Sequence, residues 1–156
     1  MIRASRILVP VNGNPTDDEA VALACEIARR GKSAVYAIYV IEVKRSLPID
    51  AEIGPEMEKG EKLLDGVEQW CEGAQIPVET ALLQAREIGP AIVDEAVARG
   101  VEGILLGISQ RKRPTDGELG STASYVLKNA PCRVWLSRGP LVADGSTAAA
   151  AEQSRG

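Results

Sequence analysis

The sequence predicts an α/β protein with an open, doubly wound, five-stranded parallel sheet and helices on both faces. Short apolar runs alternate five times with segments that are polar or have helical periodicity. Residues 33–43 are apolar on both faces of a strand, which is typical of a strand covered on both sides. Strands that alternate with helices favour parallel pairing through right-handed crossovers.

The first predicted strand covers residues 6–11, and the turn-forming residues 12–15 follow it. Thr16 is expected to cap a helix that ends at Gly31, with Glu19 completing a capping box. The predicted inward face of this helix consists of Ala20, Leu23, Ala24, Ile27 and Ala28.

A second strand is predicted over residues 33–43, and a long helix over residues 56–74. Residues 78–85 alternate in part between polar and apolar types, which favours an edge strand. The side chains of the long helix that we expect to face inward are Leu63, Leu64, Val67, Trp70 and Cys71.

Gly89 and Pro90 open a third predicted helix over residues 91–99, whose apolar stripe is Ile92, Val93, Ala96 and Val97. The fourth strand is expected over residues 103–106, the fourth helix over residues 121–129 and the fifth strand from Arg133 to Ser137. Residues 139–156 are rich in Gly, Ala and Ser, which predicts a disordered tail after a single domain of residues 1–138.

Composition excludes several classes of function. A net charge of −4 and a pI near 5.0 argue against a nucleic-acid partner. The apolar runs are too short for a membrane span or a signal peptide, so we expect a cytoplasmic protein. The chain has no histidine, which removes the commonest general base. Its three cysteines have no metal-type spacing and are interpreted as buried free thiols (Cys25, Cys71 and Cys132).

The segment from Gly107 to Ser121 is the strongest functional signal. It reads as a polar loop between a strand and a helix that begins with Gly120 and Ser121. Free N–H groups and the positive end of the helix dipole favour anions at such a helix start. The segment therefore suggests a ligand that carries phosphate.

Two stretches resemble the universal stress protein family. The opening ILVPVNGNPTDDEA is similar to the family's first strand, turn and helix, and LGI…LGSTASYVLKNAPCRVWLSR is similar to its closing signature. In that signature Gly, two residues, Gly, nine residues, Gly and Ser or Thr surround a nucleotide. The resemblance covers residues 6–138 and implies the strand order 3-2-1-4-5.

The resemblance also implies where ATP or another adenine nucleotide would bind. Pro10, Val11 and Asn12 would line the adenosine end, with Val40 against the adenine. The ribose and phosphates would meet Gly107, Gly120, Ser121 and Thr122.

Two positions depart from the family pattern. Gln110 stands at the second glycine, and Asn12 replaces the acidic residue after the first strand. Gln110 would crowd a phosphate, whereas the basic residues Arg111, Lys112 and Arg113 offer charges that could hold one. A solvated basic loop is the alternative interpretation of those charges.

Three functions remain open from the sequence. The first is a stress or signalling module that binds an adenine nucleotide without needing to hydrolyse it. The second is a nucleotide-independent dimeric regulatory protein of the same fold. An enzyme of the related adenine-nucleotide hydrolase architecture ranks last, because residues 12–15 form no Ser-Gly-Gly-type phosphate loop. We therefore expect no enzymatic activity beyond weak ATP hydrolysis, and no metal site.

The family resemblance also implies a homodimer, and protein partners beyond it fit either of the first two functions. The fifth strand, from Arg133 to Ser137, is expected to pair across the dimer, because an apolar edge strand otherwise leaves backbone N–H and C=O groups facing water.

Overall fold

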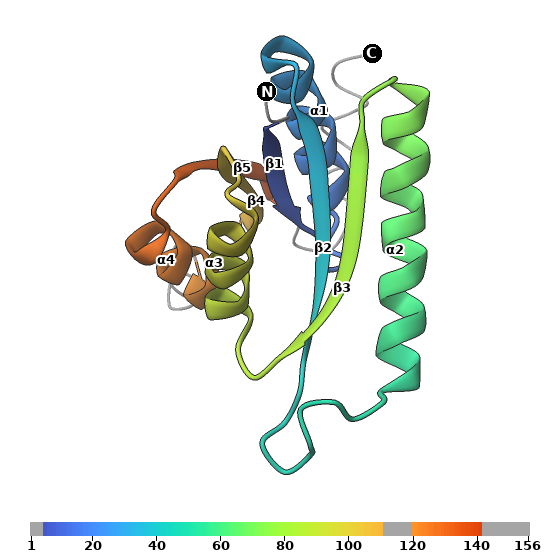
Figure 1. Ribbon diagram of the computed structural model, residues 1–156, viewed down its shortest axis with the longest axis vertical. Helices are drawn as coiled ribbons and strands as arrows, with labels where there is room; N and C mark the ends of the chain where they lie inside the picture. Colours follow the sequence, from blue (N-terminus) through green and yellow to red (C-terminus); the bar gives the residue numbers. More distant parts are fainter. Residues whose placement is uncertain (1–4, 111–119, 142–156) are drawn as a thin grey trace.

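Parallel strands in the order β3-β2-β1-β4-β5 form the centre of the molecule, which confirms the predicted fold class and strand order (Figure 1). The computed structural model describes residues 5–110 and 120–141. Within these residues the strands are β1 (Arg6–Pro10), β2 (Ala34–Glu42), β3 (Val78–Ala85), β4 (Gly103–Gln110) and β5 (Arg133–Leu141). The helices are α1 (Asp17–Gly31), α2 (Gly54–Gly73), α3 (Ile88–Arg99) and α4 (Gly120–Asn129).

The sheet separates two hydrophobic cores. Successive residues of β1 point to opposite faces, so Ile7 and Val9 enter one core and Leu8 enters the other. Residues of α1 and α2 complete the first core, and residues of α3 and α4 complete the second. In Figure 1, α2 lies to the right of the strands, and α3 and α4 lie to the left. Both faces of the sheet are thus covered, as the sequence predicts.

The contact between α2 and β2 depends on a glycine. A Cβ atom at Gly60 of α2 would lie 2.5 Å from Cδ2 of Tyr39 and 2.8 Å from Cδ1 of Leu82. The Tyr39 ring is buried, and its hydroxyl donates a hydrogen bond of 2.7 Å to Oε2 of Glu56, one turn before Gly60 on the same helix. The missing side chain therefore lets α2 lie directly on the tyrosine ring.

Three apolar side chains that were predicted to face inward are exposed instead. Leu23, Trp70 and Val97 expose 40%, 54% and 59% of their surface, so the predicted inward faces of α1, α2 and α3 were wrong at these positions. In α1 the buried face is centred on Val21 and Cys25, which displaces Leu23 to the margin. Periodicity locates an apolar stripe but does not fix which of its margins touches the sheet.

The last two strands extend beyond their predicted ends. β4 continues to Gln110 rather than ending at residue 106, and β5 continues to Leu141 rather than Ser137. The two strands stay paired through Gly107↔Ser137 and Ile108↔Arg138, and an irregularity follows before Gln110↔Leu141. Residues 139–141 therefore belong to the sheet and not to the predicted tail, whose remainder, residues 142–156, lies outside the described residues.

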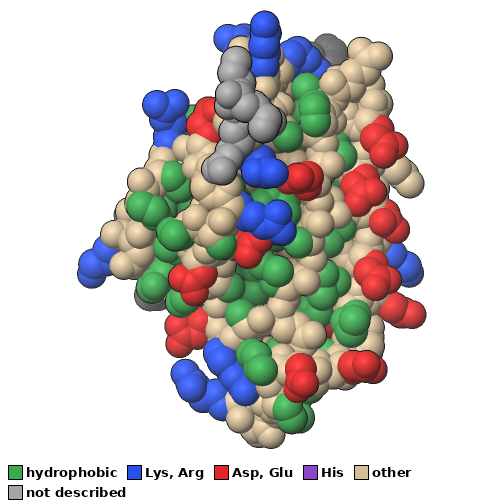
Figure 2. Space-filling model, in the orientation of Figure 1, with side chains coloured by type: hydrophobic (Ala, Val, Ile, Leu, Met, Phe, Trp, Pro, Cys, Tyr) green, Lys and Arg blue, Asp and Glu red, His purple; other side chains and the backbone are tan. Residues whose placement is uncertain are grey.

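The outward face of α2 is acidic. Figure 2 shows red side chains in a column down the right-hand edge of the view, over α2. The helix carries Glu56, Glu58, Glu61, Asp65, Glu68 and Glu72. This surface would repel a nucleic-acid backbone. In the described part of the chain, no helix combines the length and apolar character that a membrane span requires.

Candidate functional site

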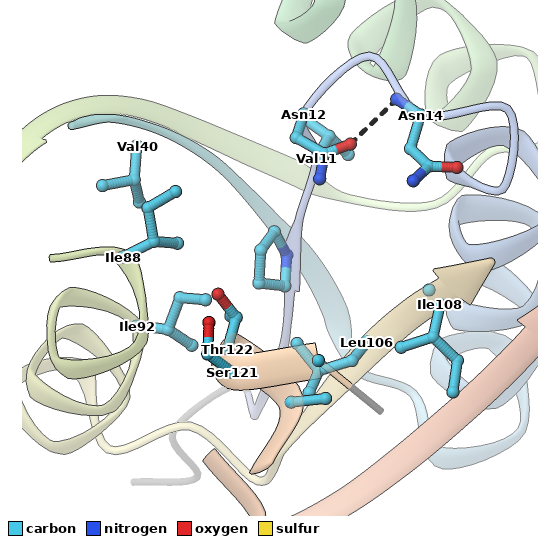
Figure 3. Close-up of a pocket in the computed structure, with 14 residues that line it drawn as sticks. Val11, Asn12, Asn14, Val40, Ile88, Ile92, Leu106, Ile108, Ser121 and Thr122 are labelled. Atoms are coloured by element: carbon cyan, nitrogen blue, oxygen red, sulfur yellow. Dashed lines mark hydrogen bonds between the residues drawn. The ribbon is translucent and has the colours of Figure 1, made fainter. Parts of the chain in front are cut away.

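One pocket brings together the eight residues that the sequence analysis assigns to a ligand site (Figure 3). Its volume is about 220 Å³. It lies where the carboxyl ends of β1 and β4 meet, which is where the chain changes its direction of winding across the sheet. The predicted residues that line it are Pro10, Val11, Asn12, Val40, Gly107, Gly120, Ser121 and Thr122.

The loop after β1 is held by its own side chains. Oδ1 of Asn12 accepts a hydrogen bond of 2.8 Å from the Asn14 N–H, which forms an Asx turn (Figure 3). The N–H groups of Gly13 and Asn12 donate to Oδ2 of Asp17, at 2.8 and 3.1 Å. The Asn12 side chain is thus hydrogen-bonded within the loop. The carboxylate that accepts hydrogen bonds from the loop backbone belongs to Asp17.

The capping box predicted for α1 was wrong. Thr16 precedes the helix, but its side chain makes no capping hydrogen bond and its backbone is already helical. The Thr16 hydroxyl instead donates to Oδ1 of Asn14 at 3.1 Å. At this end of the helix the backbone N–H groups instead bond to the Asp17 carboxylate. Partial burial raises the pKa of this carboxyl, and backbone hydrogen bonds of Gly13, Asn12 and Asn14 oppose the rise.

The start of α4 forms the opposite wall of the pocket. Gly120 has a φ of +77°, a conformation that glycine adopts without strain. The hydroxyl groups of Ser121 and Thr122 point into the space bounded by the other labelled residues in Figure 3. A helix start leaves N–H groups without partners inside the helix, so this wall offers donors and a positive dipole to an anion.

Gly107 has a structural role that the sequence analysis did not foresee. A Cβ atom there would lie 3.1 Å from Cβ of Ala20, 3.2 Å from Oγ1 of Thr16 and 3.3 Å from the Thr16 carbonyl. These atoms belong to the start of α1. Glycine at this position thus lets α1 approach β4 closely, whether or not a ligand is bound.

The first part of the segment expected to form the phosphate loop is a strand instead. The sequence analysis interprets the segment from Gly107 to Ser121 as a polar loop, but Gly107 to Gln110 belong to β4. Ile108 is partly buried and packs against the core shared with α3 and α4, which favours a strand at this position. Arg111, Lys112 and Arg113 lie outside the described residues.

Sequence reasoning missed part of the pocket wall. Ile88 of α3 lies beside Val40 in Figure 3 and forms an apolar corner with it, and Ile92 of the same helix lies nearer to Ser121 and Thr122 in this view. The signal that could have found them is their position, since α3 begins directly after the carboxyl end of β3. The other lining residues that were not predicted are Asn14, Leu106, Ile108 and Ala123.

Comparisons with known proteins identify the fold and the family. A family model described as the Universal stress protein family matches residues 4–138. The chain is similar to Universal stress protein MJ0531 of Methanocaldococcus jannaschii, with 29% identity over 141 residues, covering 86% of this chain and 82% of that protein.

Two solved structures share the fold. The universal stress protein from Archaeoglobus fulgidus in complex with dAMP has a TM-score of 0.68 and 19% identity, covering 87% of this chain and 98% of that one. A universal stress protein family protein from Arabidopsis thaliana with AMP bound has a TM-score of 0.64 and 15% identity, covering 87% and 92%. At these identities the similarity is evidence for the fold alone.

Proposed function

This chain belongs to the universal stress protein family, and on that premise we propose that it is a small cytoplasmic stress or signalling module that binds an adenine nucleotide. The observation that carries the proposal is the convergence of eight predicted residues on one pocket. They come from β1 and the loop after it, β2, β4 and α4, which are far apart in the sequence. The nucleotides named for the two structural relatives, dAMP and AMP, give the ligand class.

The two ends of the pocket suit the two ends of a nucleotide. Val40 and Ile88 form an apolar corner that can bury the faces of a purine. Ser121 and Thr122 stand at the start of α4, where backbone N–H groups and the helix dipole favour phosphate. We therefore place the base against β2 and α3 and the phosphate at α4.

Binding without rapid turnover is the activity that we propose. The side chains that line the pocket among the described residues are apolar or uncharged. Hydrolysis of ATP needs a group that orients the attacking water and charges that stabilise the transferred phosphoryl group. We expect at most weak ATP hydrolysis.

Identification of the bound ligand tests this proposal. Purified protein is denatured and the released small molecules are identified, and calorimetry then measures binding of AMP, dAMP, ATP and cyclic AMP. We expect at least one adenine nucleotide to be released or to bind. If none is released and none binds at millimolar concentration, the nucleotide proposal fails.

A nucleotide-independent dimeric regulatory protein is the second candidate function. Gln110 favours it, since this residue pairs with Leu141 in the sheet at the position where the family has a glycine in its phosphate loop. Pairing of the two strands at this point leaves the backbone less free to turn towards a phosphate.

Restoring the family's residues separates these two functions. We expect Gln110→Gly to raise the affinity for AMP about tenfold, which corresponds to about 1.4 kcal/mol, because glycine weakens the strand and permits positive φ. Asn12→Asp added to it should raise the affinity further. An aspartate oxygen can keep the bond to the Asn14 N–H, while the second oxygen is available to the ribose. Calorimetry measures both changes.

The competing explanation is that the basic residues hold the phosphate already. In that case the wild-type protein binds well, Gln110→Gly changes little, and the double variant Arg111→Ala/Arg113→Ala loses binding. Calorimetry on the wild type and these variants, under the same salt conditions, distinguishes the two explanations.

We further propose that the protein forms a homodimer through β5. This strand lies at the edge of the sheet, and the described strands pair with it on one side through β4. Leu136 on β5 exposes 38% of its surface. An edge strand with an exposed apolar side chain is a typical pairing surface.

Replacing Leu136 tests the dimer. We expect sedimentation of the wild type at micromolar concentration to show a dimer, and Leu136→Lys to raise its dissociation constant at least about tenfold, because a lysine would be buried in the interface. Leu127→Lys is the matched control, since Leu127 on α4 exposes a similar 43% and lies off the edge strand. A monomeric wild type would contradict the proposal, as would equal effects of the two substitutions.

A further inference from the structure

Two cysteines from different helices are in contact inside the core. Cys25 of α1 and Cys71 of α2 lie with their Sγ atoms 3.6 Å apart, and both side chains are buried. A disulfide has an S–S distance of about 2.05 Å, so closure requires the two sulfur atoms to approach by about 1.5 Å. Cys132, which was predicted to be buried, is only partly buried and packs against the other core, on the opposite side of the sheet.

A surface groove leads to Cys25, one member of this thiol pair. The groove lies between α1 and α2, has a volume of about 500 Å³ and is lined by Cys25, Arg29, Trp70 and Ala74 among others. Cys25 therefore forms part of the groove wall although its surface is almost fully buried. A small polar oxidant in the groove would therefore lie against Cys25.

The surroundings of the two thiols differ in their electrostatics. The hydrogen bond with Cys71 lowers the pKa of Cys25, and burial opposes it. The Arg29 guanidinium also lowers this pKa, while the carboxylate of Glu26, which is ion-paired with Arg29, raises it. The same hydrogen bond and burial raise the pKa of Cys71. Arg29 is held across the groove by a hydrogen bond of 3.3 Å from Nη2 to the carbonyl of Ala74. Cys25 is thus suited to react first, whereas Cys71 stays protonated until it loses its proton in the attack on the oxidised Cys25 sulfur.

We propose that Cys25 and Cys71 form a redox-active dithiol that a hydroperoxide converts to a disulfide between α1 and α2. The Cys25 thiolate attacks the peroxide oxygen, the O–O bond breaks, and an alcohol, or water from hydrogen peroxide, leaves with a proton. Cys25 becomes a sulfenic acid. The Cys71 sulfur then displaces its hydroxyl group, the S–S bond forms and water leaves with the Cys71 proton. Two electrons pass from the thiols to the peroxide.

Formation of this disulfide changes the stability of the protein. It joins residues that are 46 positions apart, and a cross-link over such a long loop restricts the unfolded chain. Reduction by an external dithiol restores the starting state. The oxidation state of the pair thereby reports the presence of hydroperoxide independently of the nucleotide pocket.

Oxidation of the full-length wild-type protein by hydrogen peroxide tests the proposal. Thiol titration under denaturing conditions should fall from three free thiols to one, and peptide mapping should find Cys25 linked to Cys71 within one chain. The midpoint of thermal unfolding should rise by roughly 5–10 °C and return to its starting value with dithiothreitol. Retention of three thiols, a link to Cys132, or a lower midpoint would overturn the proposal.

Single substitutions assign the order of the two steps. In Cys71→Ala, peroxide should leave a sulfenic acid on Cys25 that dimedone traps, whereas Cys25→Ala should give no trapped product at Cys71. Cys132→Ala is the matched control and should form the disulfide at the wild-type rate. Trapping at Cys71 in the absence of Cys25 would reverse the assigned roles and contradict the proposed mechanism. Peptide mapping of the wild type needs no variant and decides the pairing if a substitution prevents folding.

Discussion

Replacing Gly60 with alanine is expected to lower the free energy of unfolding by about 2 kcal/mol. The new Cβ atom would lie 2.5 Å from Cδ2 of Tyr39, so α2 must move away from the sheet or the ring must turn. The ring is buried and its hydroxyl is bonded to Glu56, which restricts that turn. The clash must also exceed the gain of about 1 kcal/mol that alanine normally brings to a helix interior. Urea unfolding monitored by circular dichroism measures the change.

Gly66 supplies a control in the same helix. A Cβ atom there would meet no atom within 4 Å, so Gly66→Ala should raise the free energy of unfolding by about 0.5–1 kcal/mol through helix propensity alone. The two substitutions are chemically identical and differ in what the new methyl group contacts. If both variants are stabilised, α2 does not pack on Tyr39 as closely as the structure has it.

Most element boundaries were accessible from the sequence because burial leaves a periodic record, whereas the strand order was implied by the family resemblance. β2 is apolar on both faces, and its residues are buried in the cores on both sides of the sheet. β3 alternates in part and lies at an edge. What periodicity could not supply is the exact rotation of each helix, which the close contact at Gly60 helps to set for α2. Trp70 was therefore assigned to the wrong side.

The pocket could be predicted in outline and not in its bonding. The eight residues carried over from the family resemblance all line it, because strand order fixes which loops meet at the carboxyl edge. Hydrogen bonds between neighbouring loop residues have no periodic signature. The bonds from Gly13 and Asn12 to Asp17 were missed for this reason, and so was the bond between Asn14 and Asn12.

The contact between Cys25 and Cys71 could not be predicted from the sequence either, although here the two residues are far apart in the chain. Both cysteines were correctly predicted to be buried and free, but 46 positions separate them in the chain. Each lies on the buried face of its own helix, and only the packing of α1 against α2 brings the two sulfur atoms together. A single sequence contains no record of that pairing.

A negative charge at the start of α4 is expected to weaken AMP binding about a hundredfold. In Ser121→Asp, the carboxylate would stand where we place the phosphate, and two like charges about 4 Å apart repel by several kcal/mol at the effective dielectric constant of a protein surface. The fold should not suffer, since Ser121 is exposed and an acidic residue in the first turn stabilises a helix by about 0.3–1 kcal/mol. Calorimetry with AMP and thermal unfolding of the same samples measure the two effects separately.

Two further measurements, one on the variant Ser121→Asn and one with adenosine as the ligand, identify the cause of the weaker AMP binding. Asparagine has nearly the shape of aspartate without its charge, so Ser121→Asn should retain most of the AMP affinity if repulsion of phosphate is responsible. Adenosine has no phosphate, so its affinity should be nearly the same in the wild type and in Ser121→Asp. Equal losses in the two variants would mean that the added side chain blocks the pocket sterically. An equal loss for adenosine and AMP would place the base, rather than the phosphate, at the start of α4, which reverses the orientation that we propose.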